Sequence, residues 1–442
     1  MAVAFPKGWM DVNLEEVVEI LDSMRVPVNN KERQSRIDGK SASQLFPYYG
    51  ATGEVGKIDG YLFNEDLVAL GEDGVPFYDH LKTKAYLLSG KTWVNNHAHV
   101  LKGWPDGLNN KILLHYLNQF DYHGYVNGGT RLKLTQANMR KIPVPLPPLA
   151  EQKVIAEKLD TLLAQVETTK ARLQRIPQIL KTFRQSVLNA AVSGKLTEEC
   201  GISQPAERMY KNLGDVGVIV KTGPFGSSLH KSDYIPNGIP VVNPMHISEG
   251  KILPSRLMSI SEKKFHELSS WQLKKGDVVV GRRGEMGRAA LYCAGEKMLC
   301  GTGSMILRSP ANVLPKYLEI IIRSPKAVDY FNRASVGSTM VNLNQKVIKA
   351  LAVYFPGLEE QTQIVNRVEE LFAFADSIEE KANAALARVN NLTQSILAKA
   401  FRGELTEQWR KDNPELITGK NSAEALLAKI KAEREAIKAT KK

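Results

Sequence analysis

Two adjacent arginines stand in a glycine-flanked segment, Gly281-Arg282-Arg283-Gly284, directly after the apolar run Val278–Val280. The run predicts a buried strand, and the glycines predict a turn that follows it. A guanidinium group in such a turn has a fork of N–H donors that matches a phosphate or the O6/N7 edge of guanine. Arg282 and Arg283 are therefore candidates for contacts with an acidic polymer such as DNA.

Further side chains in polar or glycine-rich segments have complementary chemistry. Asn95 and Asn96 have amides that can pair with adenine, and short hydroxyl side chains near glycine suit phosphate oxygens. For any one of these residues, a place in an ordinary surface loop is the simpler interpretation. The prediction of DNA contacts therefore depends on all of them taken together. The predicted DNA contacts are Arg33, Arg36, Tyr48, Tyr49, Asn95, Asn96, His97, Arg131, Thr222, Ser227, Ser228, Arg282, Arg283, Thr302, Ser338 and Thr339.

Catalytic motifs are incomplete wherever the sequence approaches one. Gly39-Lys40-Ser41 lacks the upstream glycine of a phosphate-binding loop, because position 34 is Gln. Asn243-Pro244-Met245-His246 lacks the second proline and the aromatic residue that would hold a flipped base. His97 and His99 alternate along a predicted strand, Thr92–Leu101, but no third metal ligand accompanies them. We expect neither a catalytic site nor a metal site in this chain.

Composition favours a nucleic-acid partner and a reducing compartment. The chain has 442 residues with a net charge of +12 and a pI of about 9.3, which suits an acidic polymer. Its three cysteines are too few and too scattered for a disulfide framework. The sequence contains no long apolar run, and its first residues lack the apolar region of a signal peptide. We expect a cytoplasmic protein without a membrane partner.

Two long segments of the chain are versions of one another. Pro147–Glu198 recurs without a gap as Pro356–Glu407, so that Gln152 and Gly194 are matched 209 residues later (361 − 152 = 403 − 194 = 209). An ungapped internal repeat predicts a duplicated structural unit. The same offset aligns 128–136 with 337–345, so the duplication extends into the preceding domain.

Each copy of the repeat has apolar residues at alternating steps of four and three, which predicts the a/d seam of a coiled coil. A core-facing helix of an ordinary bundle is the alternative. Gly194 and Gly403 predict the helix ends, and Pro177 predicts a bend in the first helix. The seam residues are Ile155, Leu159, Leu162, Val166, Leu173, Ile176, Leu180, Phe183, Ile364, Val368, Leu371, Ile378, Val389 and Leu392.

The segments around the repeat predict five regions. Residues 1–146 and 205–355 are expected to be mixed α/β domains, and 147–204 and 356–407 the two helices. The tail, 408–442, is basic and contains an amphipathic helix that begins near Asn421, either docked or solvated. Within the first domain, 29–43 is predicted to be a polar loop.

The order of these motifs resembles a known family. A variable domain, the sequence PLPPLAEQ at Pro145–Gln152, a heptad helix that ends in SGKLT, and then a second copy of the whole unit resemble the DNA specificity subunit of type I restriction–modification systems. The segments 150–197 and 386–406 are similar to the conserved regions of its enterobacterial class. The second copy departs from the pattern at Gly357, where the first has Pro148.

The resemblance implies a non-catalytic scaffold in which two target-recognition domains are joined by two long antiparallel helices with pseudo-twofold symmetry. It implies double-stranded DNA as ligand, with each domain reading half of a split, asymmetric site. It also implies that the helices bind two methyltransferase (modification) subunits, together with restriction subunits. Under this resemblance the chain itself has no cofactor, and S-adenosylmethionine, ATP and Mg²⁺ belong to the partners.

Two other function classes are compatible with parts of the sequence. A DNA modification enzyme acting alone would need the cofactor and catalytic motifs that are incomplete here. A coiled-coil adaptor that does not touch DNA would leave the two diverged basic domains without a role. An assay of the purified chain, with and without S-adenosylmethionine and a co-expressed methyltransferase subunit, separates the three classes.

Overall fold

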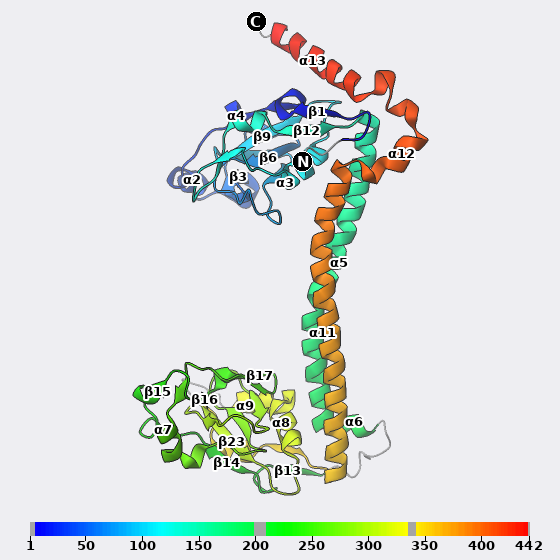
Figure 1. Ribbon diagram of the computed structural model, residues 1–442. Helices are drawn as coiled ribbons and strands as arrows, with labels where there is room; N and C mark the ends of the chain where they lie inside the picture. The colour runs from blue at the N-terminus through cyan, green and yellow to red at the C-terminus, as the bar shows by residue number, and fades with distance from the viewer. Residues whose placement is uncertain (1–4, 199–208, 335–341, 441–442) are drawn as a thin grey trace. The chain divides into compact units, whose positions relative to one another are not determined.

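The computed structural model describes residues 5–198, 209–334 and 342–440 (Figure 1). Contacts divide the chain into two compact units, of which the first contains Met1–Leu173 and Ala385–Lys442, and the second contains Gln174–Ala384. Two helices, α5 (Leu149–Val192) and α11 (Leu358–Phe401), run through both units. Each unit therefore combines one α/β domain with half of each long helix.

The domain of the first unit is built around two four-stranded sheets, with strand orders β2-β9-β6-β7 and β4-β3-β8-β5. A separate pair, β1-β12, leads into and out of the domain, and a short hairpin joins β10 to β11. The elements are β1 (Met10–Asn13), α1 (Leu14–Val17), β2 (Val18–Ile20), α2 (Asn30–Ile37), β3 (Phe46–Gly50), β4 (Gly53–Ile58), β5 (Phe63–Asn64), β6 (Leu67–Gly71), β7 (Ala85–Leu88), β8 (Lys91–Val94), β9 (Ala98–Gly103), α3 (Asn110–Gln119), β10 (Val126–Asn127), β11 (Lys133–Leu134), α4 (Gln136–Arg140) and β12 (Pro143–Leu146).

The second unit repeats this plan. Its main sheets have the orders β14-β23-β20-β21 and β15-β19-β16-β22, and β13 pairs with β24 as β1 pairs with β12. The elements are α6 (Lys195–Glu198), β13 (Tyr210–Asn212), β14 (Ile219–Thr222), β15 (Tyr234–Ile235), β16 (Ile239–Val242), β17 (Ile247–Ser248), β18 (Lys251–Ile252), β19 (Ser259–Ile260), α7 (Glu262–Glu267), β20 (Val278–Gly281), β21 (Ala289–Leu291), β22 (Leu299–Cys300), β23 (Ser304–Arg308), α8 (Pro315–Arg323), α9 (Pro325–Ala334), α10 (Gln345–Lys349) and β24 (Ala352–Tyr354).

Strand registers show that the central strands of the two domains are equivalent. Gly71 pairs with Ala98 at the end of β6, and Gly281 pairs with Ser304 at the end of β20. The second sheet of each domain contains a parallel pair, β3 with β8 and β16 with β22. The predicted pseudo-twofold repeat of two α/β domains is thus confirmed in the topology.

The long helices pack against each other antiparallel. In the first unit Ile155 and Leu159 of α5 share a core with Ile396 of α11, and in the second unit Val187 of α5 shares a core with Ile364 of α11. Both helices end before the predicted glycines, which adopt the left-handed conformation (Gly194, φ 74°; Gly403, φ 72°). Helix α5 continues through Pro177.

One residue of the predicted seam is misplaced. Leu392 is 46% exposed, whereas Thr393 beside it is half-buried. A strict seven-residue repeat drifts by roughly 20° per heptad on a helix with 3.6 residues per turn. The buried stripe therefore shifts by one position near the end of α11.

Two predictions about local structure are wrong. The segment 29–43 is not a loop, because α2 occupies Asn30–Ile37 and Asn29 Oδ1 accepts a hydrogen bond from the Glu32 amide at 2.9 Å. The predicted strand Thr92–Leu101 is two strands, β8 and β9, which are joined by a turn. His97 therefore lies in that turn, while His99 is buried in β9.

The C-terminal tail is docked on the first unit. It forms α12 (Glu407–Asp412) and α13 (Ala423–Thr440), and Ser422 rather than Asn421 caps α13. Helix α13 buries Leu426 and Ile430, and Trp104 Nε1 donates to Glu433 Oε2 at 2.7 Å. The tail is therefore docked as far as Arg434, which donates to Glu15 O, whereas 435–440 are exposed.

Candidate nucleic-acid interface

Three loops meet at one end of the main sheet in the first unit. They are the segment after β6 (71–74), the turn between β8 and β9 (95–97), and the segment before β11 (127–132). Main-chain hydrogen bonds join them, from Glu72 N to His97 O at 2.8 Å and from Gly74 N to Leu132 O at 3.0 Å. This three-loop cluster brings together several of the predicted contacts.

Asp73 organises the exposed side chains of the cluster. Its Oδ1 lies 2.9 Å from His97 Nδ1 and accepts a hydrogen bond from Arg131 Nη2 at 3.0 Å. The side chains of His97 and Arg131 are 43% and 65% exposed, whereas that of Asp73 is 19% exposed. Arg131 therefore has guanidinium donors left for a ligand, and Asp73 fixes the direction in which they point.

Asn95, Asn96 and Tyr49 lie beside the group formed by Asp73, His97 and Arg131. Asn95 accepts a hydrogen bond from the His97 amide through Oδ1 at 2.8 Å, and its own amide donates to Tyr49 O at 3.1 Å. Asn96, at the tip of the turn, is exposed. Tyr49 stacks on Tyr86 with ring centroids 5.6 Å apart. Asn96 is thus available to a ligand, while the Asn95 oxygen shapes the turn.

Three of the predicted contacts serve the fold of the first domain. Tyr48 is buried, and its hydroxyl donates to Val28 O at 3.0 Å, so the prediction that it contacts DNA is wrong. Arg36 pairs with Asp59 at 2.7 Å and stacks over Trp93 at 4.7 Å. Arg33 stacks over Tyr48 at 5.4 Å. Both arginines hold α2 against the β3–β4 edge and keep part of their surface exposed.

A buried polar network supports the same cluster from below. His99 Nδ1 lies 2.7 Å from Asp22 Oδ2, His99 Nε2 lies 2.9 Å from Leu134 O, and the Val100 amide donates to Asp22 Oδ1 at 2.9 Å. Burial opposes ionisation of Asp22, but the hydrogen bonds from His99, Val100 and Gln136 outweigh it and keep the pKa of this carboxyl below its ordinary value. The network fixes β9 to β11, and hence two of the three loops.

The second unit repeats two loops of this cluster, and the segment equivalent to the third loop, 336–341, lies outside the described residues. The Arg282 amide donates to Gly303 O at 3.0 Å and the Leu343 amide donates to Arg282 O at 2.9 Å, as Glu72 and Leu134 do in the first unit. Arg282 Nε donates to Asn342 Oδ1 at 2.9 Å, and burial together with the neighbouring Arg283 lowers the pKa of Arg282. Arg283 is exposed.

The equivalent positions carry opposite charges in the two clusters. Glu72 and Asp73 of the first unit correspond to Arg282 and Arg283 of the second, since Asp73 bridges to Lys133 as Arg283 bridges to Asn342. The first cluster presents His97 and Arg131 around a carboxylate, and the second presents arginines directly. Two clusters of one geometry and different chemistry suit two different half-sites.

The other predicted residues of the second unit lie near its cluster or outside the described residues. Thr222 ends β14, and the adjacent Gly223 amide donates to Ser304 O at 2.9 Å. Ser227, Ser228 and Thr302 lie in turns and are exposed or half-buried. Ser338 and Thr339 lie outside the described residues.

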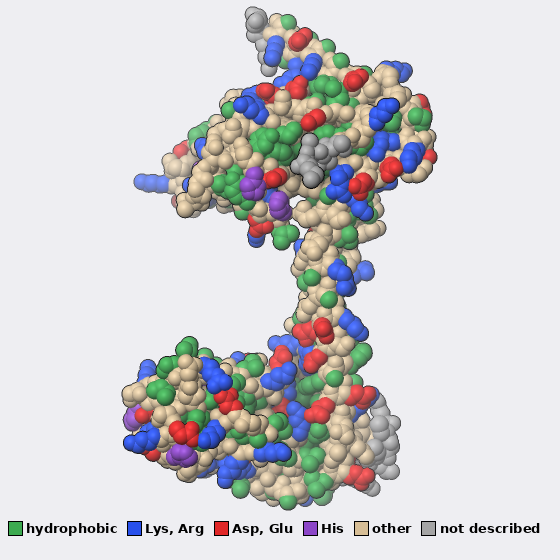
Figure 2. Space-filling model, viewed as in Figure 1, with side chains coloured by type: hydrophobic (Ala, Val, Ile, Leu, Met, Phe, Trp, Pro, Cys, Tyr) green, Lys and Arg blue, Asp and Glu red, His purple; other side chains and the backbone are tan. Residues whose placement is uncertain are grey.

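Charge is distributed rather than gathered into one patch. Figure 2 shows acidic and basic side chains interspersed on the visible face of each unit. Within the described ranges, no group of three His, Cys, Asp or Glu side chains could hold a metal ion. None of the helices described is long and apolar enough to span a membrane. The candidate DNA contacts are therefore the loop side chains of the two clusters.

A repeated glutamate–glutamine pair joins each domain to the long helices; Glu151, Gln152 and Gln361 are buried and Glu360 is half-buried. Glu151 accepts hydrogen bonds from Trp9 Nε1 at 2.8 Å and Thr406 Oγ1 at 2.6 Å. It also forms an ion pair with Arg410 at 2.5 Å. In the second unit, Glu360 Oε1 accepts from Thr197 Oγ1 at 2.6 Å. These contacts join the start of one helix to the segment that follows the end of the other.

The glutamine beside each of these glutamates binds the domain. Gln152 Nε2 donates to Gly107 O at 2.8 Å and its Oε1 accepts from the Asn109 amide at 3.0 Å. Gln361 makes the same two bonds, to Asn312 O at 3.0 Å and from the Leu314 amide at 2.8 Å. The internal repeat reveals Glu151-Gln152 and Glu360-Gln361 in the sequence. Their role in attaching each domain is seen only in the structure.

Comparison with known proteins identifies the class to which this fold and these clusters belong. The family model of the type I restriction modification DNA specificity domain matches residues 6–178 and 205–388, once in each repeat. The chain therefore belongs to the type I restriction–modification specificity subunits. The predicted family and the prediction of a specificity subunit rather than an enzyme acting alone are confirmed.

Individual relatives agree with this assignment. The chain is 44% identical over 309 residues to the type I restriction enzyme EcoKI specificity subunit of Escherichia coli strain K12, which covers 68% of this chain and 66% of that one. It is 37% identical over 459 residues to the EcoBI specificity subunit of Escherichia coli, with 97% and 93% covered. The crystal structure of the HsdS subunit from Thermoanaerobacter tengcongensis has a similar fold, with a TM-score of 0.57, 18% identity, and 91% and 99% of the chains covered.

Proposed function

We propose that this chain reads a split, asymmetric DNA site for a type I restriction–modification complex, with one three-loop cluster for each half-site. The observation that supports the proposal most directly is the opposite charge of equivalent loop positions, Glu72-Asp73 and Arg282-Arg283, on one loop geometry. The first cluster presents His97 and Arg131 around the paired Asp73 carboxylate, whereas the second presents Arg283, whose guanidinium can donate to guanine. The two clusters therefore suit different bases.

The partners follow from the family and the repeat. We propose that two copies of a methyltransferase subunit bind the chain, because the duplicated helices offer two equivalent surfaces, and that restriction subunits join this complex. S-adenosylmethionine, ATP and Mg²⁺ are expected on those subunits. The target base is expected to be adenine, as in the family resemblance.

The test uses the full chain with and without its methyltransferase subunit. We expect specific adenine methylation only from the complex, at a motif with two unlike halves separated by an unread spacer. Sequencing of methylated bases in a host that carries the locus gives the motif directly. Methyl transfer by the isolated chain, or a motif without two halves, would contradict the proposal.

A further inference from the structure

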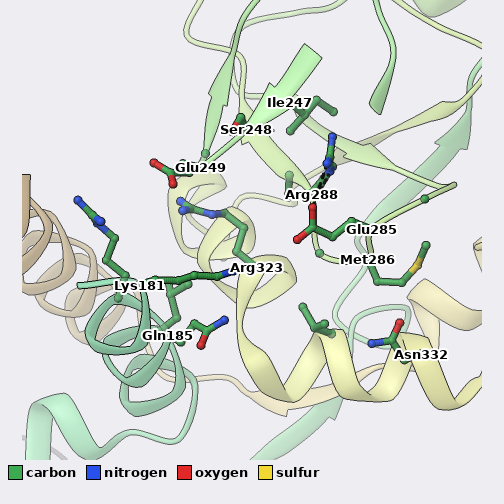
Figure 3. A pocket seen from close by; sticks show the side chains of 17 residues that line it. Lys181, Gln185, Ile247, Ser248, Glu249, Glu285, Met286, Arg288, Arg323 and Asn332 are labelled. Atoms are coloured by element: carbon green, nitrogen blue, oxygen red, sulfur yellow. Dashed lines mark hydrogen bonds and ion pairs between the residues drawn. The ribbon is translucent and has the colours of Figure 1, made fainter. Parts of the chain in front are cut away.

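The second unit contains a pocket of about 520 Å³ beside its long helices. Figure 3 shows Lys181 and Gln185 on the α5 side, with Glu249, Arg288 and Arg323 on the side of the domain. Glu249 belongs to the turn between β17 and β18, Arg288 to the connection from β20 to β21, and Arg323 to the end of α8. The pocket is thus walled by both the helix and the reading domain.

A shortened connection leaves this pocket open. Between β20 and β21 the chain runs through 282–288, whereas the corresponding connection between β6 and β7 in the first unit runs through 72–84. The longer connection adds six residues (13 − 7). The first unit therefore has six more residues than the second in the connection that lies beside the long helices.

In the first unit, that longer connection binds the residues that correspond to the pocket walls. Gln394 Nε2 donates to His80 O at 2.9 Å, and Gln394 is the repeat equivalent of Gln185, 209 residues earlier. Asn118 Oδ1 accepts from the Lys84 amide at 2.7 Å, and Asn118 occupies the α3 position that Arg323 occupies on α8. In the first unit, the side chains equivalent to the pocket walls therefore bind main-chain groups of segment 72–84.

Most cations around the open pocket already have acidic partners. Arg323 pairs with Glu319 at 2.7 Å, Arg288 with Glu285 at 2.9 Å, and Arg184 with Asp376 at 2.7 Å. Lys181 is exposed, and within the described ranges no carboxylate pairs with it. Glu249 also lines the pocket, and no cation among the described residues forms an ion pair with it. A surface that offers both a free ammonium group and a free carboxylate suits a polypeptide loop better than a row of phosphates.

We propose that a loop of the methyltransferase subunit occupies this pocket in the assembled complex. The loop places a main-chain carbonyl on Gln185 and a carboxylate on Lys181, and so replaces the segment that the first unit supplies from its own chain. This inference depends on the proposed function, because that function provides the partner. It assigns a contact that the second unit makes in addition to the helix surfaces shared by both units, since segment 72–84 of the chain itself occupies the corresponding place in the first unit.

The test measures association of the methyltransferase subunit with the full chain, independently of methylation. Lys181→Glu is compared with Asn390→Glu, because Asn390 is the exposed equivalent of Lys181 in the repeat. We expect Lys181→Glu to weaken association by about tenfold or more, which is about 1.4 kcal/mol, and Asn390→Glu to leave it within about twofold. Equal effects of the two substitutions would overturn the proposal.

A second pair of variants separates docking from folding. Gln185→Ala is expected to weaken association and to leave the urea unfolding of the free chain unchanged, because Gln185 faces an open pocket. Gln394→Ala is expected to destabilise the free chain, because it removes the hydrogen bond to His80. Normal association of Gln185→Ala and Lys181→Glu with the methyltransferase subunit would rule out the docking site.

DNA is the competing occupant. If the pocket holds a phosphate, Lys181→Glu will reduce the DNA affinity of the fully assembled complex and flatten its salt dependence, with subunit association unchanged. That result overturns the docking proposal but leaves the proposed function intact. A wild-type complex that assembles without specific methylation would instead contradict the proposed function alone.

Discussion

At the scale of single residues, the two candidate reading clusters differ in how they hold a cationic side chain for the proposed DNA ligand. Arg131 is held by Asp73, whereas Arg283 is exposed in a turn fixed through Arg282 and Asn342. A buttressed arginine has one preferred direction, which favours recognition of one base edge. The arginine pair also concentrates positive charge, which favours phosphate contacts.

Arg283→Ala distinguishes base reading from phosphate binding. If Arg283 reads a base, we expect Arg283→Ala to reduce the binding free energy for one half-site by about 1–3 kcal/mol and to relax the base specificity at one position of that half-site. The measurement is DNA binding by the assembled complex to a panel of single-base variants at several salt concentrations. Uniform weakening with a smaller salt slope would assign Arg283 to phosphate, and unchanged binding would make it a bystander.

Asp22 makes the stability of the first domain depend on acid pH. A carboxyl group whose pKa is lower in the folded than in the unfolded chain adds stability above its unfolded pKa, near 4, and this stability is lost as pH falls through the folded pKa. We expect unfolding of the first domain to become easier below about pH 4, and Asp22→Asn to remove that part of the dependence.

The measurement for Asp22 is urea unfolding from pH 3 to 7, followed by hydrogen exchange of peptides from β9 and β11. Asp160→Asn is the control, since that carboxylate is exposed and pairs with Lys111 on the surface. Identical pH profiles for the wild type and Asp22→Asn would show that the network contributes nothing to this dependence.

At the scale of elements, the sequence predicted the helices that belong to the internal repeat or that bury a face with regular apolar spacing. The heptads predicted the two long helices α5 and α11. Helix α2 was missed because it buries no residue, so its sequence carries no apolar period. The β8–β9 turn was missed because Asn95-Asn96-His97 contains neither Gly nor Pro, the strongest turn signals.

The reading clusters were only partly predictable for a different reason. Arg131, His97 and Arg283 have recognisable ligand chemistry, and they were predicted from residue type and neighbouring glycines. Asp73 has no local signal, because its partners lie 24 and 58 residues away in sequence. Such pairings depend on strand order, which local pattern does not specify.

The glutamate–threonine contact between the two helices supports a stability prediction. Thr406→Val keeps the shape of the side chain but removes one of the donors to buried Glu151, at an expected cost of about 1–3 kcal/mol. Thr197→Val should have a similar effect through Glu360 in the second unit. Urea unfolding with hydrogen exchange resolved by unit measures both.

Thr362→Val is the matched control for these variants. Thr362 lies on the exposed face of α11, and its hydroxyl donates only to Leu358 O within the same helix. We expect its effect to stay within about 0.5 kcal/mol. If Thr406→Val is equally mild, the contact with Glu151 does not stabilise the first unit.

At the scale of the whole molecule, duplication and divergence have different consequences. The helices and their Glu-Gln pairs keep the same contacts in both copies, so each domain is attached in the same way. The reading loops have changed charge, and the β6–β7 and β20–β21 connections have changed length. Attachment is therefore shared, while recognition and the proposed docking of the methyltransferase subunit are specific to each half.

Spacing between half-sites is the property that the long helices are expected to set. Each helix has 44 residues, which corresponds to roughly 66 Å at about 1.5 Å per residue. Inserting one heptad into each helix preserves the a/d seam and adds about 10 Å. At about 3.4 Å per base pair, this is roughly three base pairs.

We predict that this double insertion lengthens the unread spacer and leaves both half-site sequences unchanged. The loops that read bases are attached through Glu151-Gln152 and Glu360-Gln361, which the insertion does not touch when it is placed near the middle of each helix. Sequencing of methylated bases in cells that carry the variant with its methyltransferase subunit measures the spacer. A heptad inserted into only one helix is the control, because it shifts the seam against its partner and should abolish methylation. Altered half-sites with the original spacer would show that the helices do not determine the spacing, and that the three-loop clusters adjust to the DNA by other means.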